Sequence, residues 1–311
     1  MTTVSVIIPT YNYAEYVKRA AESAREQEVE GGVEVIVVDD GSTDDTEAVV
    51  TALPGVEYVK QANAREGAAR NNGASRASGR YLAFLDPDDY YLPGKLAADV
   101  ARFEAGDEPA LVYSRARNVD QDDRPIGVRM LPSPQGDIFW AFAREPFIPM
   151  STVAVRADAF RECGGFGEER DLSGTADWDM WIRLAARWNV GFVDRVGTCI
   201  RVHQRNMSSD GNWMERGNLT ALRRVLADPA VAERTRGRAG ELRSHMYVTN
   251  ATKAYAYGQW GRSWKWLIAA VREWPPQAVS PRFLGALARA VVGPTGGRLI
   301  RTLPRPRAVA P

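Results

Sequence analysis

Cysteine and histidine are scarce in this chain, with two of each in 311 residues. Cys163 and Cys199 belong to no paired-spacing motif, so we expect two reduced thiols and no zinc site built from Cys and His. Excess charge is also small, because 40 Lys and Arg oppose 39 Asp and Glu and leave a net charge of +1. This balance argues against nucleic acid as a partner.

Long apolar runs and glycine-rich phosphate loops are missing as well. No apolar stretch reaches the ~20 residues that cross a bilayer. The first residues, MTTVSVIIPTYN, lack the basic and apolar regions of a signal peptide. We therefore expect a cytoplasmic protein, associated at most peripherally with the inner face of a membrane. No G-x-G-x-x-G follows the first strand-like run, which disfavours a dinucleotide-dependent oxidoreductase and counts against a nucleotidyltransferase.

The basic residues are unevenly spread. No Asp or Glu follows Glu273, whereas six Arg do: Arg282, Arg289, Arg298, Arg301, Arg305 and Arg307. The segment Phe283–Val292 can form an amphipathic helix. This C-terminal tail is therefore either a partly disordered, solvated segment or a peripheral contact with anionic lipid.

The first half of the chain alternates strand and helix signals with short connections. Such βαβ units predict an α/β fold, with a mainly parallel central sheet flanked by helices. Asn12 is in a position to cap the first helix, which runs to about Glu26. The expected strands are Val4–Pro9, Val33–Asp39, Val56–Lys60, Tyr81–Leu85 and Leu111–Ser114, and the later helices of this half end near Leu53, Ala77 and Glu104.

The pattern changes twice after residue 120. Residues 120–149 are rich in proline and predict loop and short helix. Ser151–Val155, Val190–Val193 and Thr198–Val202 predict strands, and residues from Asn212 onward predict helices. We expect an α/β domain over residues 1–210 and a helical region over residues 211–311.

Acidic residues stand where strands are expected to end or a helix to begin. In an open α/β sheet, ligands bind beyond the carboxyl ends of the strands. Asp86 and Asp88, two residues apart, could both point at one Mg²⁺ or Mn²⁺ ion, whose preferred ligands are carboxylate and phosphate oxygens. The alternative is an acidic turn without a ligand. Asp39 and Asp40 follow the most apolar strand and could accept hydrogen bonds from a base or ribose.

Four motifs occur in order at close spacing: VSVIIPTYN at residues 4–12, VVDDGSTD at residues 37–44, GAARN at residues 67–71 and LDPDD at residues 85–89. Together they resemble the family-2 glycosyltransferases, which have the GT-A fold. The resemblance covers residues 4 to 205, about two-thirds of the chain, and the conjunction of four motifs is specific.

The resemblance implies a role for particular residues in binding a nucleotide-sugar. Pro9, Thr10 and Tyr11 would line the nucleotide pocket, with Tyr11 packed on the base. Asp40 would hydrogen-bond the base with Asp39 nearby, Arg70 would hold the nucleotide, and Asp86 would lie near the ribose and sugar. Asp88 would be the principal metal ligand. The family implies UDP as the default nucleotide, with dTDP and GDP as known variants.

A third acidic site lies in the segment Asp177–Trp181. On a helix, Asp177 shares a face with the apolar residues Met180, Trp181, Leu184 and Trp188. Asp179 points elsewhere, and we expect it to pair with Arg183 on the outside. The segment resembles the Glu-Asp motif of the family, with Asp177 as the catalytic base and Ala176 in place of the Glu. The alternative is an acid that only stabilises the helix N-terminus.

Arg201 and His203 follow the last expected strand of the α/β domain. The resemblance implies that they reach the donor diphosphate, where Arg201 could bind phosphate and His203 could also bind the metal. His245, among the C-terminal helices, is expected to be structural.

These residues predict an inverting, metal-dependent transfer of a sugar from a nucleotide-sugar, UDP-sugar by default, to a hydroxyl acceptor. The acceptor class stays open between a glycan, a lipid-linked sugar and a small molecule. Acceptor specificity is expected in residues 120–150 and 168–176, with Trp140, Phe142 and Trp178 as candidate contacts. A subunit that binds nucleotide-sugar without catalysis is the main alternative, and a sugar nucleotidyltransferase is a further one.

Overall fold

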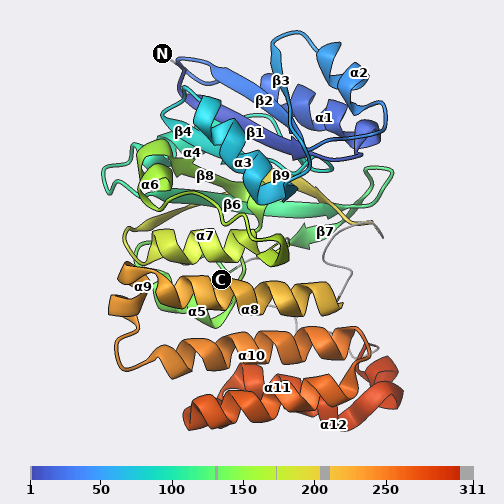
Figure 1. Ribbon diagram of the computed structural model, residues 1–311, viewed down its shortest axis with the longest axis vertical. Coiled ribbons are helices and arrows are strands. Elements are labelled where there is room, and N and C mark those ends of the chain that lie inside the picture. Colours follow the sequence, from blue (N-terminus) through green and yellow to red (C-terminus); the bar gives the residue numbers. More distant parts are fainter. Residues whose placement is uncertain (1, 130–131, 173, 204–210, 302–311) are drawn as a thin grey trace. The chain divides into compact units, whose positions relative to one another are not determined.

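The computed structural model describes residues 2–129, 132–172, 174–203 and 211–301. The chain forms two compact units (Figure 1), the first made of Met1–Phe142 and Pro146–Arg234 and the second of Ala143–Glu145 and Thr235–Pro311. The first unit therefore continues past residue 210, where we expected the α/β domain to end. It does so because helices α8 (Gly211–Ala227) and α9 (Pro229–Arg234) pack on α7 (Ala176–Ala185).

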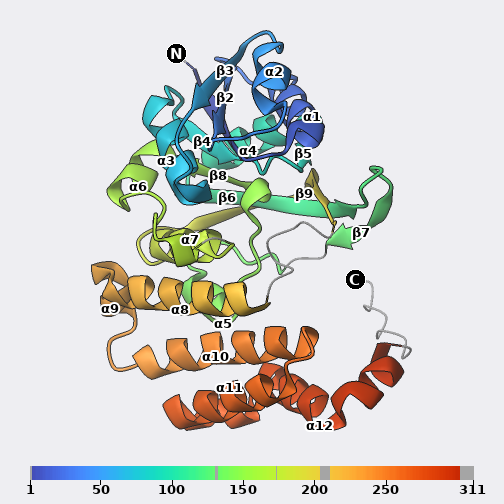
Figure 2. The same cartoon turned by 45° about the vertical axis from the view of Figure 1, so that its right-hand side comes forward.

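The first unit is built on one sheet, which has nine strands within the described residues. Their order is β3-β2-β1-β4-β8-β6-β9-β5, and β7 pairs with β6 outside this path (Figure 2). The strands are β1 (Val4–Thr10), β2 (Val33–Asp39), β3 (Val56–Lys60), β4 (Tyr81–Phe84), β5 (Tyr90–Tyr91), β6 (Leu111–Val119), β7 (Pro125–Arg129), β8 (Val153–Arg156) and β9 (Val190–Arg201).

Strands β3, β2, β1 and β4 are mutually parallel, whereas β8 runs antiparallel to both β4 and β6. Strand β9 is parallel to β6 and antiparallel to β5. The expected α/β fold is confirmed, and its sheet is mixed with a parallel half. Because β1, β2 and β4 are parallel, their carboxyl ends meet at one edge of the sheet, where a ligand can bind.

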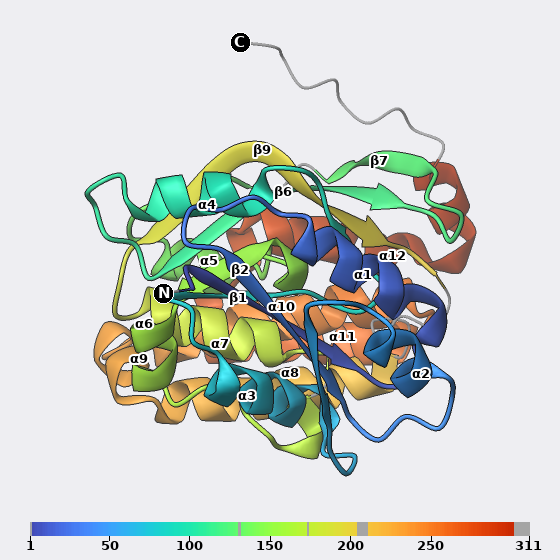
Figure 3. The same ribbon diagram turned by 90° about the horizontal axis from the view of Figure 1, so that it is seen from above.

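Helices cover both faces of the parallel half, with α1 (Ala14–Arg25) and α3 (Arg65–Arg76) on opposite sides of β1 and β2 (Figure 3). Val4, Val6 and Ile8 point into a core shared with α1. Ile7 lies on the other face, where a Cβ on Gly73 of α3 would come within 2.6 Å of it. This alternation follows from the two-residue period of a strand. The other described α-helices of this unit are α2 (Thr46–Thr51), α4 (Lys95–Phe103), α5 (Phe139–Arg144) and α6 (Ala157–Glu162). The last two residues of α5 are counted with the second unit.

Asn12 does not cap α1. Its φ is +57°, its backbone N–H donates to Ser42 Oγ at 2.9 Å, and its Oδ1 accepts from the Thr43 N–H at 2.8 Å. These bonds tie the end of β1 to the loop after β2. The residue therefore organises the edge of the sheet where the candidate site lies.

The second unit consists of three long helices, α10 (Ala239–Ala256), α11 (Trp260–Glu273) and α12 (Pro281–Arg301), with a short 3₁₀ turn, η4 (Pro275–Val279), between the last two. Leu242, Leu267 and Phe283 are buried between them. Over the described residues, none of the helices combines the length and hydropathy of a membrane span. The end of the expected basic tail, residues 302–311, lies outside the described residues.

Candidate active site

A cavity of about 560 Å³ opens at the carboxyl edge of the parallel strands. Its walls come from the ends of β1, β2 and β4, from the first turns of α3 and α7, and from the loop before β8. The cavity is large enough for a nucleotide-sized ligand. The residues predicted from the sequence that line it are Pro9, Thr10, Tyr11, Asp40, Arg70, Asp86, Asp88 and Asp177.

Asp40 is buried and held by the segment between β3 and α3. Its carboxylate accepts hydrogen bonds from Gln61 Nε2 at 2.7 Å and from the backbone N–H groups of Ala64 and Arg65, both at 2.8 Å. Asp39 is fully buried and does not line the cavity. Its oxygens accept from the Ser42 N–H at 2.7 Å and from the Tyr58 hydroxyl at 2.6 Å. The structure thus gives the two adjacent acids different surroundings.

Arg70 and Asp86 form an ion pair on the cavity wall, with Nη2 2.8 Å from Oδ1. Arg70 is 4% exposed. Its Nε and the Oγ1 of Thr10 are buried atoms that have no hydrogen-bond partner among the described residues. Buried donors of this kind normally have a partner. Two of them at one cavity wall are consistent with a polar ligand there.

Asp88 lies next to His203, whose Nε2 is 3.0 Å from Asp88 Oδ2. The imidazole stacks on Tyr16, with ring centroids 5.5 Å apart and planes at 14°. His203 is not among the cavity-lining residues, yet it contacts one that is. The structure therefore brings together the two residues that were predicted to bind a metal.

Arg201 is buried and does not line the cavity. Its Nε donates to the Asp88 carbonyl at 3.0 Å and its backbone N–H to Asp89 Oδ1 at 2.9 Å. Its Nη1 and Nη2 donate to the turn before β7, to the Gln121 carbonyl and to Asp123 Oδ1 respectively. These contacts fix the Asp86–Asp89 turn, and the phosphate contact of Arg201 stays a prediction.

Three acids, Asp86, Asp88 and Asp89, lie within four residues of this turn. Burial raises the pKa of Asp89 well above its usual value, and the carboxylates of Asp88 and Asp86 raise it further. Burial also raises the pKa of Asp86, and Arg70 opposes this effect. The carboxyl groups of this turn therefore oppose one another's ionisation. The described residues contain no group of three or more His, Cys, Asp or Glu arranged to hold a metal by themselves.

Asp177 stands in the first turn of α7 at the cavity wall, and its Oδ1 accepts from the Trp178 N–H at 2.7 Å. Its carboxylate is close enough to raise the pKa of Asp86. This position agrees with the argument from the helix period, which directed Asp177 toward the candidate site. Asp179 pairs with Arg183 at 2.8 Å, as expected. The expectation that this pair lies on the outside is wrong, because both side chains are buried.

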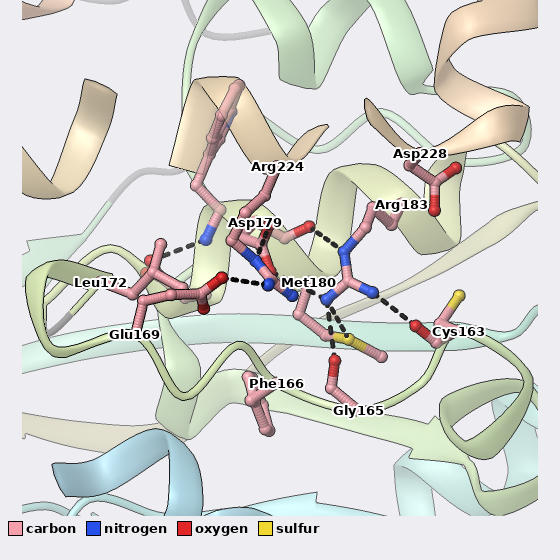
Figure 4. A network of polar contacts seen from close by, with 12 residues as sticks. Cys163, Gly165, Phe166, Glu169, Leu172, Asp179, Met180, Arg183, Arg224 and Asp228 are labelled. Carbon is pink, nitrogen blue, oxygen red and sulfur yellow. Dashed lines mark hydrogen bonds and ion pairs between the residues drawn. The ribbon is translucent and has the colours of Figure 1, made fainter. Parts of the chain in front are cut away.

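The Asp179–Arg183 pair is the centre of a network beneath α7 (Figure 4). Arg183 donates to the carbonyls of Cys163 and Gly165 at 2.5 and 2.8 Å. Arg224 of α8 approaches Asp179 at 3.3 Å and Glu169 at 2.5 Å. The segment 163–172 is therefore fastened to α7 and α8. The side of α7 opposite the cavity is buried under α8, which explains why Asp179 could not be placed from the helix period alone.

Sequence reasoning missed other cavity residues. Glu66 lines the cavity and its Oε1 accepts from the Gly174 N–H at 2.8 Å, which joins α3 to the turn before Asp177. Phe147, Ile148 and Met150 also line it, within the proline-rich stretch where acceptor specificity was expected. The candidate contacts Phe142 and Trp178 are instead core residues, 1% and 2% exposed. Glu66 had no signal beyond its place beside the GAARN motif.

Comparison with known proteins agrees with this architecture. The sequence profile described as "Glycosyl transferase family 2" matches residues 5–164. Chondroitin synthase of Escherichia coli is 30% identical over 213 residues, which are 66% of this chain and 30% of that protein. S. aureus TarS 1–349 in complex with UDP-GlcNAc covers 93% of this chain and 88% of its own, with a TM-score of 0.63 and 16% identity. The mannosyltransferase PcManGT of Pyrobaculum calidifontis, in complex with GDP-Man and Mn²⁺, covers 93% and 86%, with a TM-score of 0.60 and 17% identity.

The mixed sheet and these structural neighbours show the GT-A fold. The chain belongs to glycosyltransferase family 2. It spans about a third of the length of the chondroitin synthase that it matches.

Proposed function

We propose that this protein transfers a sugar from a nucleoside-diphosphate sugar, with UDP as the nucleotide, to a hydroxyl acceptor with inversion at the anomeric carbon. The observation that carries the proposal is that Asp177 lines one cavity together with most of the predicted donor-binding residues, Asp39 and Arg201 being the exceptions. A protein that only binds nucleotide-sugar has no use for a carboxylate at the acceptor side of the donor. The retained Asp177 therefore supports catalysis.

In the proposed reaction, Asp177 removes the proton from the acceptor hydroxyl while the acceptor oxygen bonds to the anomeric carbon. The bond from that carbon to the diphosphate oxygen breaks in the same step, and the nucleoside diphosphate leaves with its electron pair. A single displacement of this kind inverts the anomeric centre. The acceptor must reach Asp177 along the wall formed by Glu66, Gly174 and the loop Pro146–Ser151.

The donor's diphosphate is proposed to bind near Arg70, Asp86 and Asp88. Asp88 and His203 form a two-residue donor set, which suits an Mg²⁺ or Mn²⁺ ion that takes its other ligands from phosphate and water. When bound, the ion would neutralise charge on the leaving diphosphate. Arg201 is proposed to act by holding the Asp88 backbone and the Asp89 side chain in place.

The nucleotide is proposed to lie against Pro9, Thr10 and Tyr11, with Tyr11, which is 46% exposed, stacking on the base. UDP is favoured because TarS forms complexes with UDP and UDP-GlcNAc, and GDP is the principal alternative because PcManGT forms a complex with GDP-Man. The acceptor is proposed to be a glycan, a lipid-linked sugar or a small molecule, and the similarity to chondroitin synthase favours a growing glycan.

The first test is the thermal stability of the protein with UDP, dTDP, GDP and CDP, each with and without Mn²⁺. We expect UDP to raise Tm only with metal, and Asp88→Asn to abolish this rise. Asp158→Asn provides a matched control, since Asp158 lies in α6 and outside the cavity lining. Stabilisation by none of the nucleotides would remove the basis of the donor site.

The second test separates catalysis from binding. We expect Asp177→Asn to keep the UDP-dependent rise in Tm and to lower kcat by roughly 10²–10⁴-fold, the usual contribution of a general base. NMR of the product's anomeric proton then determines whether the configuration is inverted. Unchanged turnover in Asp177→Asn would exclude it as the base, and binding without transfer to any acceptor would favour the non-catalytic alternative.

A further inference from the structure

The near-zero net charge of the chain conceals two units of opposite charge. The second unit has 14 Lys or Arg and three Asp or Glu, which give it a net charge of +11. The first unit must therefore carry −10. Charge of one sign on this scale creates a field that attracts an anionic partner.

The acids of the second unit are largely neutralised within it. Glu241 is buried and ion-paired with Arg238, and Glu273 is paired with Arg243 at 2.8 Å. No Asp or Glu follows Glu273 in the sequence. Glu145, the third acid of this unit, is exposed near Arg282, so the described surfaces of α11, η4 and α12 present mainly positive charge.

Helix α11 buries one stripe and exposes another. Ser263, Trp266, Leu267 and Ala270 face the core of the second unit. The exposed stripe is formed by Trp264, Lys265, Ile268 and Arg272, which alternate between apolar and basic. Trp with Lys and Arg on an exposed helix face is the composition of segments that lie at a membrane interface.

Helix α12 and the turn before it add apolar side chains. Phe283, Ala286 and Ala290 are buried, whereas Leu284, Ala288, Val291 and Val292 of the same helix are exposed. Among the side chains of the second unit that the structure describes, the large exposed hydrophobic ones are Trp264, Ile268, Val279, Leu284, Val291 and Val292, with exposed fractions of 39 to 77%. Helices α11 and α12 contact each other and both pack against α10, on one side of it (Figures 1 and 2), so their outer faces adjoin.

We propose that this outer face of α11, η4 and α12 docks on an anionic lipid bilayer. The apolar side chains enter the headgroup region, and the Lys and Arg residues contact the lipid phosphates. Nucleic acid fits less well, because phosphate contacts come from basic and polar side chains whereas this face is centred on apolar ones. The proposal concerns the second unit alone and does not depend on the proposed transfer reaction.

The test is cosedimentation of the full chain with vesicles of phosphatidylcholine alone and of phosphatidylcholine with about one-third phosphatidylglycerol. We expect binding to the anionic vesicles only, weakening between ~0.1 M and ~0.5 M salt. The double variant Lys265→Gln/Arg272→Gln should bind more weakly by roughly fivefold per removed charge. Trp264→Ser/Ile268→Ser should lower the partition coefficient about tenfold or more.

A matched control is Ile126→Ser/Val128→Ser, which removes two exposed apolar side chains from β7 of the first unit. This control should bind as the unaltered protein does, and all variants should keep their Tm because the substituted residues are exposed. Equal losses in the control and in Trp264→Ser/Ile268→Ser would overturn the proposal. So would equal binding to neutral vesicles, or no binding to anionic ones.

Two other partners of this face, a second copy of the chain and nucleic acid, would give different results in these experiments. If a second copy covers this face, light scattering will show a dimer that Trp264→Ser/Ile268→Ser dissociates. If nucleic acid covers it, a DNA duplex will bind in anisotropy measurements and Lys265→Gln/Arg272→Gln will weaken that binding while vesicle binding is absent. Either result would replace the lipid surface as the partner.

Discussion

At the scale of single residues, Gly67 lies where α3 closely approaches the segment 163–172. A Cβ built on Gly67 would lie 2.3 Å from the Gly167 carbonyl oxygen, a backbone atom. We expect Gly67→Ala to lower the free energy of unfolding by about 1–3 kcal/mol, because a buried backbone must move. Urea unfolding measures this change.

Gly261 serves as the control for that substitution. It also lies in a helix, α11, but an added Cβ would meet nothing within 4 Å. We expect Gly261→Ala to be neutral or to stabilise its helix by about 0.5–1 kcal/mol. Equal effects of the two substitutions would show that helix propensity, and not the contact with Gly167, sets the result at Gly67.

Several site residues could be predicted individually because their motifs are local. Pro9 to Tyr11 lie at the end of β1 and Asp86 to Asp88 follow β4, and strand ends can be predicted from apolar runs. The partners of Asp39 and Asp40 could not be predicted in this way. Asp40 is bonded by backbone N–H groups 24 and 25 residues later in the chain. Such long-range bonds leave no pattern in the sequence.

At the scale of elements, the segment 163–172 is clamped between α3 and α7. The Asn71 side chain of α3 bonds both the N–H and the carbonyl of Phe166, each at 2.9 Å. From the other side, Arg183 bonds the carbonyls of Cys163 and Gly165 (Figure 4). The position of α7, and with it Asp177, therefore depends on a segment without regular strand pairing.

We expect Arg183→Met to lower the free energy of unfolding by about 3–5 kcal/mol, because it leaves the Asp179 carboxylate buried with one partner fewer. Lys18→Met is the matched control. Lys18 is also paired at i+4, with Glu22 at 3.9 Å, but on the surface. Lys18→Met should lower the free energy of unfolding by less than ~1 kcal/mol. Similar losses in urea unfolding for both would contradict the role assigned to burial.

The elements that could be predicted are those with strong periodicity. β2 and β3 have the bounds that their apolar runs predict, and β1, β4 and α4 differ from prediction by one or two residues. The two-residue β5 and the edge strand β7 were missed, since neither carries a run long enough to read. Val190–Val193 and Thr198–Val202 were expected as two strands but belong to one, β9, because register shifts opposite Arg115 interrupt the pattern without ending the pairing.

At the scale of the whole molecule, the two units should differ in their response to acid. His245 of the second unit is buried beside Glu241, with Arg144 and Arg282 near, and burial lowers the pKa of its imidazole to about 4. The unfolded chain binds this proton near pH 6.5. Stability from neutral His245 is therefore full above pH 6.5 and is lost as the pH falls toward 4.

Between pH 7 and pH 5 this linkage should remove about 2 kcal/mol from the stability of the second unit. Hydrogen exchange of the α10 amides, corrected for intrinsic rates, measures the loss. We expect His245→Gln to reduce this dependence, and the amides of β1 and β2 in the first unit to be unaffected by the substitution. A variant as acid-sensitive as the unaltered protein would assign the effect to carboxylates instead.

The extent of the two units could be predicted only in part. β9 ends at Arg201 and α8 begins at Gly211, and α8 and α9 belong to the first unit through their packing on α7. Membership of a unit is decided by which surface a helix buries. A helical pattern shows that a helix has an apolar face, and it does not show what that face covers.

The hydrogen bonds that hold Asp40 also affect how a ligand would bind in this cavity. Three hydrogen bonds fix the carboxylate, and two of them come from the backbone that leads into α3. This wall of the cavity is therefore already ordered in the folded protein, before a ligand binds. A ligand that docks there immobilises little protein, so more of its contact energy is retained as affinity.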